Sequence, residues 1–433
     1  MGGSRALRLD RRRGSAPGDA ARRDVSAEAA RDAAQRAARD SYGRLLSILS
    51  ARTRDIALAE DALADAFESA LETWPRTGVP DNPAAWLVTA ARRNTLDAWR
   101  HDQVREAAAQ TLHLLADEFT ESEAAGAVPD ERLRLLFVCA HPAIDAVART
   151  PLMLQTVLGL DVQRMAGAFL TAPATLGQRL TRAKSRIRQA GIPFEFPEAR
   201  DLPDRLLDVL DGIYAAYGTG WDDIDGTDST RRLSNEAIEL CALLCRLMPA
   251  EPEPLGLLAL MLFCESRASA RRDGAGAYVP LDAQDTAQWN RPMIGEAEHA
   301  LRHAASLAAP GPYQLEAAIQ SAHTQRRLGA DVPAAALVSL YDGLLALRPS
   351  VGAQVSRCCA VARAEGPLAG LAALDLLDAE VVVNYQPWWA ARAHLLAEAG
   401  RTTEAQAAYQ RAIGLSAHPA VRAHLARVAS GAG

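Results

Sequence analysis

The chain of 433 residues is 49% hydrophobic and 23% charged, a composition typical of a globular protein with room for two or three domains. It has no apolar run near the roughly 20 residues of a membrane-spanning helix, and its Arg-rich start lacks the apolar stretch of a secretory signal. Its 6 cysteines lack the CxxC spacing typical of zinc sites. The sequence therefore predicts a cytoplasmic protein with no metal, no cofactor and no membrane association.

The net charge of -6 is unevenly distributed along the chain. Residues 130–192 contain 9 basic and 4 acidic residues, whereas residues 193–433 contain 20 basic and 29 acidic residues. Local charge decides contact with a polyanion more than total charge does. A basic block inside an acidic chain therefore indicates a surface for a polyanion.

The N-terminal part of the chain predicts an extension followed by a small helical domain. Residues 1–40 are rich in Arg and are expected to form a disordered extension. Within 41–100, apolar residues recur every three or four positions, as on one face of an amphipathic helix. Asn82 and Pro83 are residue types that cap and open a further helix. Residues 101–129 turn acidic and are expected to form a linker.

The segment from Leu160 to Arg188 has the pattern of a helix-turn-helix. Asp161 is suited to cap a short first helix, and Thr171-Ala172-Pro173 separates it from a second. The second helix has a predicted buried face of Leu176, Leu180, Ala183 and Ile187. Its predicted exposed face has no acid and consists of Thr175, Gln178, Arg179, Arg182, Lys184, Arg186 and Arg188. Such side chains reach base edges and neutralise phosphates, so residues 130–192 are predicted to bind DNA.

Two weaker candidate surfaces precede this domain. Between Pro80 and Arg100, aromatic and basic residues share one predicted helix, which suits stacking on unpaired bases. Its members are Trp86, Arg92, Arg93, Asn94, Trp99 and Arg100. An acidic face lies upstream and consists of Asp55, Glu60, Asp61, Asp65 and Glu68. It suits docking on a basic partner, although plain solvation is the favoured interpretation from these residues alone, and a residue such as Trp86 is more often part of a core.

Residues 200–433 are predicted to be a succession of helices separated by Pro and Gly. No segment of the chain alternates convincingly with the period of a strand, so the fold class is predicted to be all-α. Within 388–415, small and aromatic residues fall where a tetratricopeptide repeat packs: Ala393, Gly400, Ala405, Tyr409 and Ala412. Such a repeat needs neighbours, so a stacked array is expected. The array is either a binding site for a protein partner or a structural cap.

Several segments together resemble a known family. AEDALADAF at 59–67, NPAAWLVTAARRNTLDAWR at 82–100 and the helix-turn-helix resemble the extracytoplasmic-function group of sigma-70 family RNA polymerase sigma factors. DERLRLLFVCAHPAI at 130–144, with similar matches at 258–272 and 311–325, resembles the subgroup with a C-terminal helical extension. The resemblance implies a factor that binds core RNA polymerase, through its β′ clamp and β subunit, and promoter DNA.

The resemblance also implies roles for individual residues. Glu60, Asp61 and Asp65 match the acidic helix that docks on the polymerase clamp. The promoter -10 element would be engaged by Trp86, Arg92, Arg93, Asn94 and Asp97. The -35 element would be read by Thr175, Gln178, Arg179, Arg182, Lys184 and Arg186.

The residues alone leave two other protein classes open. One is a stand-alone helix-turn-helix regulator with a repeat-type protein-binding domain, and the other is a repeat scaffold with a basic surface. No GxSxG, HExxH, Walker loop or GxGxxG occurs in a suitable context, so the sequence predicts no catalytic residues and no enzyme activity. Copurification with core polymerase distinguishes the sigma factor from both alternatives.

Overall fold

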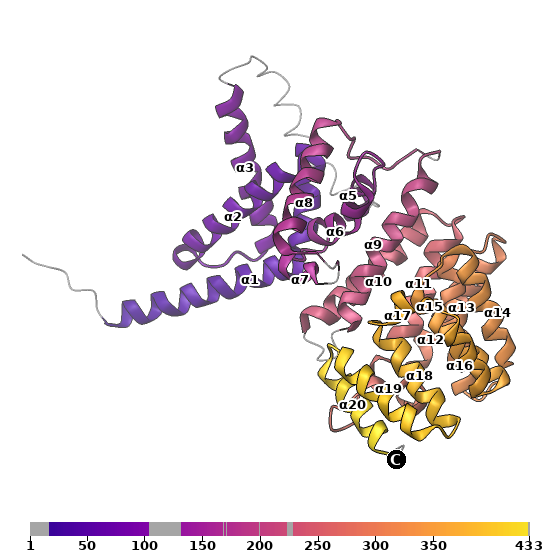
Figure 1. Cartoon of the computed structure of the whole chain (residues 1–433). Coiled ribbons are helices and arrows are strands. Elements are labelled where there is room, and N and C mark those ends of the chain that lie inside the picture. Colours follow the sequence, from indigo (N-terminus) through magenta and orange to yellow (C-terminus); the bar gives the residue numbers. More distant parts are fainter. Residues whose placement is uncertain are drawn as a thin grey trace, which may run out of the picture. The chain divides into compact units, whose positions relative to one another are not determined.

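The computed structural model describes residues 17–103, 131–167, 169, 171–198, 200–222 and 228–431. These residues form helices and turns with no strand, which confirms the predicted all-α class. They divide into two compact units, Met1–Gly212 and Ile213–Gly433, and the boundary falls inside α9, Leu202–Asp222 (Figure 1). Among the described helices, none combines the length and apolar character needed to cross a bilayer.

The first unit begins with three helices that share one core. These are α1 (Pro17–Thr53), α2 (Ile56–Thr77) and α3 (Pro83–Gln103), and α1 packs against both others. The side chain of Asp55 caps α2 by accepting hydrogen bonds from the amides of Ala57 and Leu58. The indole of Trp74 is fully buried and meets Trp86 edge to face, with ring centroids 5.4 Å apart.

The expectation of a disordered extension over residues 1–40 is wrong from Pro17 onward. Helix α1 begins at Pro17, and four of its alanines lie in the core of the first three helices: Ala30, Ala33, Ala34 and Ala37. Spacings of three and four residues place them on one helix face. Because alanine is only weakly hydrophobic and arginines surround these alanines, the sequence pattern does not indicate a buried helix face here. Residues 1–16 lie outside the described part of the chain.

Four further helices of the first unit build the predicted helix-turn-helix domain. They are α5 (Glu131–Cys139), α6 (Ala146–Thr156), α7 (Val162–Ala166) and α8 (Pro173–Gln189). Asp161 caps α7 as predicted, accepting a hydrogen bond from the Arg164 amide at 2.9 Å. The predicted buried face of α8 is also confirmed, because Leu176, Leu180, Ala183 and Ile187 are all buried. Residues 104–130, with most of the expected linker, lie outside the described residues.

Close backbone contact joins the two halves of the first unit. A Cβ atom on Gly43 of α1 would overlap the carbonyl group of Val157, which caps α6. Gly159, with φ of +66°, lies against the ring of Tyr42. Burial, helped by the nearby charge of Glu60, raises the pKa of Tyr42 to about 12. The contact is therefore a packed interface that tolerates no side chain at Gly43.

The start of α9 belongs to the first unit, although residues from 200 onward were expected to form the C-terminal domain. Arg149 of α6 donates to Asp208 at 2.6 Å, and a Cβ on Gly212 would press against the sulfur of Met153. The boundary between the two units therefore lies at Gly212, inside α9, and not at residue 200, where the sequence predicts the start of the C-terminal domain.

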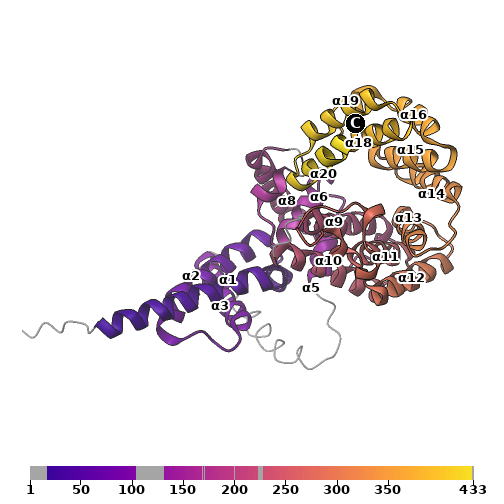
Figure 2. The same cartoon turned by 90° about the horizontal axis from the view of Figure 1, so that it is seen from below.

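The second unit is a row of antiparallel helices that follows an arc from α12 to α19 in Figure 2. Its bounds are α10 (Asp228–Leu247), α11 (Pro252–Glu265), α12 (Arg291–Ser306), α13 (Pro312–Arg327), α14 (Ala334–Leu347), α15 (Val351–Glu365), α16 (Pro367–Asp375), α17 (Ala379–Val382), α18 (Gln386–Glu398), α19 (Thr402–Leu415) and α20 (Pro419–Gly431). Between α11 and α12 lie the short 3-10 helices η1 (Ala268–Arg271), η2 (Leu281–Ala283) and η3 (Thr286–Gln288).

The residues predicted to pack as a tetratricopeptide repeat lie in α18 and α19. Ala393, Ala405, Tyr409 and Ala412 are buried in one core cluster, as expected. Gly400 connects the two helices with φ of +75°, a conformation that favours glycine. The helix pair thus has the packing of such a repeat, while membership of that repeat family is a proposal.

Candidate nucleic-acid interface

Most of the residues that are predicted to read DNA lie on one side of α8. At about 100° per residue, Thr175, Gln178, Arg179, Arg182 and Arg186 lie within one sector of the helix. All are exposed apart from Arg179, which is half-buried. Neither Arg179 nor Arg182 pairs with a described residue, so their guanidinium groups are available to a ligand.

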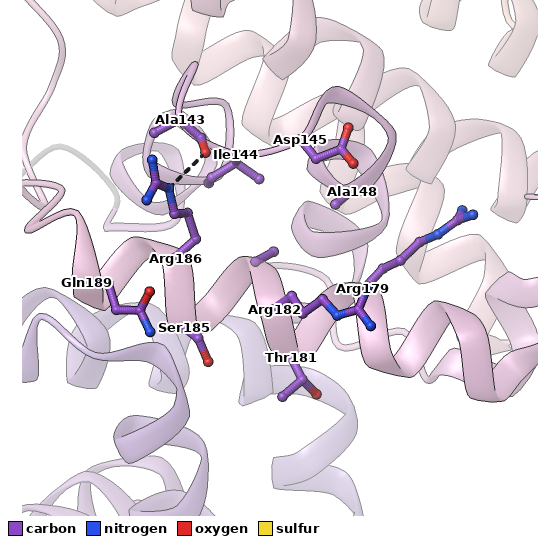
Figure 3. Close-up of a pocket in the computed structure, with 11 residues that line it drawn as sticks. Ala143, Ile144, Asp145, Ala148, Arg179, Thr181, Arg182, Ser185, Arg186 and Gln189 are labelled. Carbon is purple, nitrogen blue, oxygen red and sulfur yellow. Dashed lines mark hydrogen bonds between the residues drawn. The ribbon is translucent and has the colours of Figure 1, made fainter.

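An open cavity of about 470 Å³ lies alongside this face. It is bounded by α8 and by the segment from Ala143 to Ala148, which begins α6 (Figure 3). The Nε atom of Arg186 donates to the Ala143 carbonyl at 3.4 Å, whereas Arg179 extends past the other end of the cavity (Figure 3). The arginines therefore line an open surface and do not fold back into the core.

Lys184 is separated from the other members of the predicted DNA-reading set. It lies on roughly the opposite side of α8, about 140° around the helix from Arg179 and about 160° from Arg182 and Arg186. Its ammonium group instead contacts both carboxylate oxygens of Glu60 on α2, each at 2.6 Å. The Lys184 side chain is only 11% exposed and that of Glu60 is 22% exposed.

A second ion pair supports the same contact between α8 and α2. Arg188 donates to Asp55 at 3.3 Å, while the other carboxylate oxygen of Asp55 caps α2. The structure therefore joins two residues to which the sequence assigned different partners, Glu60 for polymerase and Lys184 for DNA. Lys184 is the only lysine in the chain, but nothing in the sequence indicates its partner 124 residues away.

Reversing the Lys184–Glu60 pair is expected to reveal its contribution to stability. Lys184→Glu or Glu60→Lys alone would place like charges together in a half-buried contact and should destabilise the fold by about 1–3 kcal/mol. The double variant should recover most of that loss in urea unfolding. Arg182→Glu, on the exposed side of the same helix, should change stability by less than about 0.5 kcal/mol. Additive single effects with no recovery would contradict the pairing.

The acidic face of α2 divides into two parts in the structure. Glu60 faces α8, whereas Asp61, Asp65 and Glu68 are exposed along one stripe. Asp61 and Asp65 make no ion pair with a described residue. A free acidic stripe on a rigid helix is suited to a basic partner surface.

The predicted single-strand surface on α3 is partly in the core. Trp86 is half-buried against Trp74, Arg92 and Asn94 are half-buried, and Arg93 is exposed. The side chain of Asp97 lies outside the described residues, as do those of Trp99 and Arg100. Among the predicted -10 residues whose side chains the structure describes, Arg93 is thus the most accessible.

The first unit thus combines a three-helix domain with two helices joined by a short turn, α7 and α8, and a large helical extension follows it. Residues 38–105 match the family model of sigma-70 region 2, and residues 205–305 match a family of unknown function, DUF6596. The chain is 42% identical over 383 residues to the uncharacterized protein R00370 of Rhizobium meliloti (strain 1021), which covers 86% of this chain and 89% of that protein. No solved structure matches the chain.

The chain belongs to the same family as this Rhizobium relative, and its match to sigma-70 region 2 supports membership of the sigma-70 family. Sigma-70 family members are regulatory factors of transcription and not enzymes. Region 2 implies binding to core RNA polymerase and promoter DNA. The matched segment contains both the acidic stripe of α2 and the predicted surface of α3.

Proposed function

We propose that this protein is an extracytoplasmic-function sigma factor that directs core RNA polymerase to promoters in the cytoplasm. The observation that carries the proposal is the exposed side of α8, where Arg179 and Arg182 are free on the second helix of a helix-turn-helix. Arg is the commonest specific partner of guanine in the major groove. In this proposal, α8 reads the -35 element, and copurification with core polymerase is the first test.

Region 2 supplies the other two functions in the proposal. The exposed Asp61 and Asp65 dock on the β′ clamp of the polymerase, because their carboxylates make no ion pair with a described residue and face solvent. The exposed Arg93, with Arg92, Asn94 and Asp97 on the same helix, engages the -10 element. Trp86 supports this helix from the core through its contact with Trp74.

The contact between α2 and α8 limits which promoter elements the factor can bind at the same time. By their names the two promoter elements are centred about 25 base pairs apart, roughly 85 Å of duplex at about 3.4 Å per base pair. The Lys184–Glu60 contact of 2.6 Å holds region 2 against α8. Both elements therefore cannot be occupied while this pair is intact, and we propose that the pair breaks when the factor joins the polymerase.

The acidic C-terminal unit is proposed to regulate promoter binding. Residues 213–433 contain 18 basic and 23 acidic residues, and a body of net negative charge repels DNA and favours a protein partner. The helical array of α18 and α19, packed as a repeat, is the proposed partner-binding part.

Removing this unit is expected to strengthen binding of the first unit to DNA. A chain that ends at Gly212 retains the contact between Asp208 and Arg149 and so keeps its own core. Its affinity for promoter duplex at low salt should rise several-fold, because acidic charge near the complex is lost. Fluorescence anisotropy at low and high salt measures this. Equal affinity for both chains at low salt would show that the acidic unit does not act on DNA binding.

A further inference from the structure

The second unit contains a polar cavity of about 330 Å³ that none of the functions above uses. It is lined by Asp282, His323, Arg326, Arg327 and Arg363, which come from η2, α13 and α15. Ligand pockets in proteins range from roughly 300 to 1,000 Å³. The cavity therefore has room for a small ligand, and its lining is almost entirely charged.

Several guanidinium donors at this cavity have no acceptor. Arg326 makes no side-chain hydrogen bond or ion pair with a described residue, and its Nη1 atom is buried. The Nε atom of Arg327 is likewise buried without an acceptor, although its Nη2 donates to the Gln284 carbonyl at 2.9 Å. Buried donors without acceptors destabilise a fold. An acceptor group bound in this cavity would satisfy these donors.

The charge of the lining defines the acceptor that fits. Arg363 pairs with Asp282 at 3.1 Å, which leaves two positive charges from Arg326 and Arg327. Burial, together with the charges of Arg363 and Arg267, lowers the pKa of His323 to about 4, so this imidazole is neutral near pH 7. A neutral imidazole still has one N–H donor. The cavity therefore matches a compact ligand with about two negative charges.

We propose that this cavity binds the phosphate group of a small phosphate monoester. A phosphate monoester carries a charge of about -1.5 to -2 at pH 7 and has three terminal acceptor oxygens that point in different directions. The neighbouring forks of Arg326 and Arg327 on α13 suit such a tetrahedral group, whereas a planar carboxylate offers only two oxygens. A nucleic acid fits less well, because the surrounding segment 193–433 is acidic.

Isothermal titration of the full chain tests the proposal without polymerase or DNA, so its outcome does not depend on the proposed function. The probes are inorganic phosphate and glycerol 3-phosphate, with succinate as the dicarboxylate control at equal ionic strength. Saturable binding of one phosphate probe per chain is expected, with little heat from succinate. Binding of inorganic phosphate alone would show recognition of the free ion, and tighter binding of the ester would show recognition of the rest of the molecule. Both outcomes support a phosphate site.

The decisive variant is Arg326→Gln, because the Arg326 side chain makes no hydrogen bond or ion pair with a described residue that the substitution would break. It should weaken phosphate binding at least tenfold. Arg302→Gln is the matched control, since Arg302 is an exposed arginine on α12 of the same unit with no described partner. It should bind as the unmodified chain does.

Equal affinity of Arg326→Gln and the unmodified chain would overturn the proposal, and so would equal binding of succinate and phosphate. Should Arg326→Gln fail to fold, Arg326→Lys keeps the charge but loses the planar fork. Its affinity is expected to lie between those of the unmodified chain and a chain without the site. An unchanged affinity in the folded Arg326→Lys chain would also count against the phosphate geometry.

Discussion

The double variant Asp61→Arg/Asp65→Arg is expected to lose all measurable association with core RNA polymerase. Both carboxylates are exposed on α2, inside the region 2 match, and neither pairs within the described chain. Reversing both changes the local charge by four units, and like charges facing each other across an interface cost several kcal/mol. Copurification and surface binding to core polymerase measure the loss.

A matched control on α1 separates this effect from a general change in charge. Glu28 and Asp32 are exposed, unpaired among the described residues and also four positions apart, but they precede the matched region. Glu28→Arg/Asp32→Arg should therefore copurify at normal yield. If Asp61→Arg/Asp65→Arg also copurifies normally while folded, the polymerase does not dock on this stripe.

Substituting the two free arginines of α8 is expected to have the second largest effect. Arg179→Ala and Arg182→Ala should each weaken promoter-dependent transcription by about 10- to 100-fold, because a base contact is worth about 1–3 kcal/mol. Binding to polymerase should stay intact, since both residues lie away from the stripe on α2. The loss is measured as transcription from a cognate promoter, and the affinity of each variant for polymerase is measured in parallel.

Arg188→Ala is the control for these variants. Arg188 lies on the same helix but on the side of α8 that faces Asp55, and its side chain is 61% exposed. Its loss should leave promoter selection unchanged. Normal transcription by both Arg179→Ala and Arg182→Ala would place the DNA-reading surface elsewhere.

The helix-turn-helix shows what the sequence can predict. The buried face of α8 follows from the spacing of Leu176, Leu180, Ala183 and Ile187, and the cap of α7 follows from Asp161. Both are local properties, decided within one or two helical turns. The same holds for Gly400, whose positive φ ends α18.

The sequence-based predictions are wrong for residues whose role depends on the direction of a side chain or on packing against a distant segment. The lack of acidic residues in the second helix places Lys184 in the same predicted DNA-binding set as Arg179. The position of Lys184 around the helix axis instead directs its side chain toward Glu60. The alanine face of α1 was obscured by the surrounding charge.

The cavity at His323 shows the limit of sequence reasoning most clearly. Its ion pair joins Asp282 to Arg363 across 81 residues. The sequence treats His323 as one of several scattered histidines, and no periodicity or motif links it to Arg363. Only the packing of α13 against neighbouring parts of its own unit brings these groups together.

Run-off transcription with core RNA polymerase distinguishes a sigma factor from a protein that only binds DNA. Core polymerase would be incubated with pooled genomic templates, with and without this chain, and the 5′ ends of the transcripts sequenced. If the chain is a sigma factor, the sequenced transcripts include some that require the chain and share one pair of upstream elements about 25 base pairs apart. The double variant Arg179→Ala/Arg182→Ala should remove these transcripts. A chain that binds duplex DNA alone but gives no polymerase-dependent transcript would contradict the account.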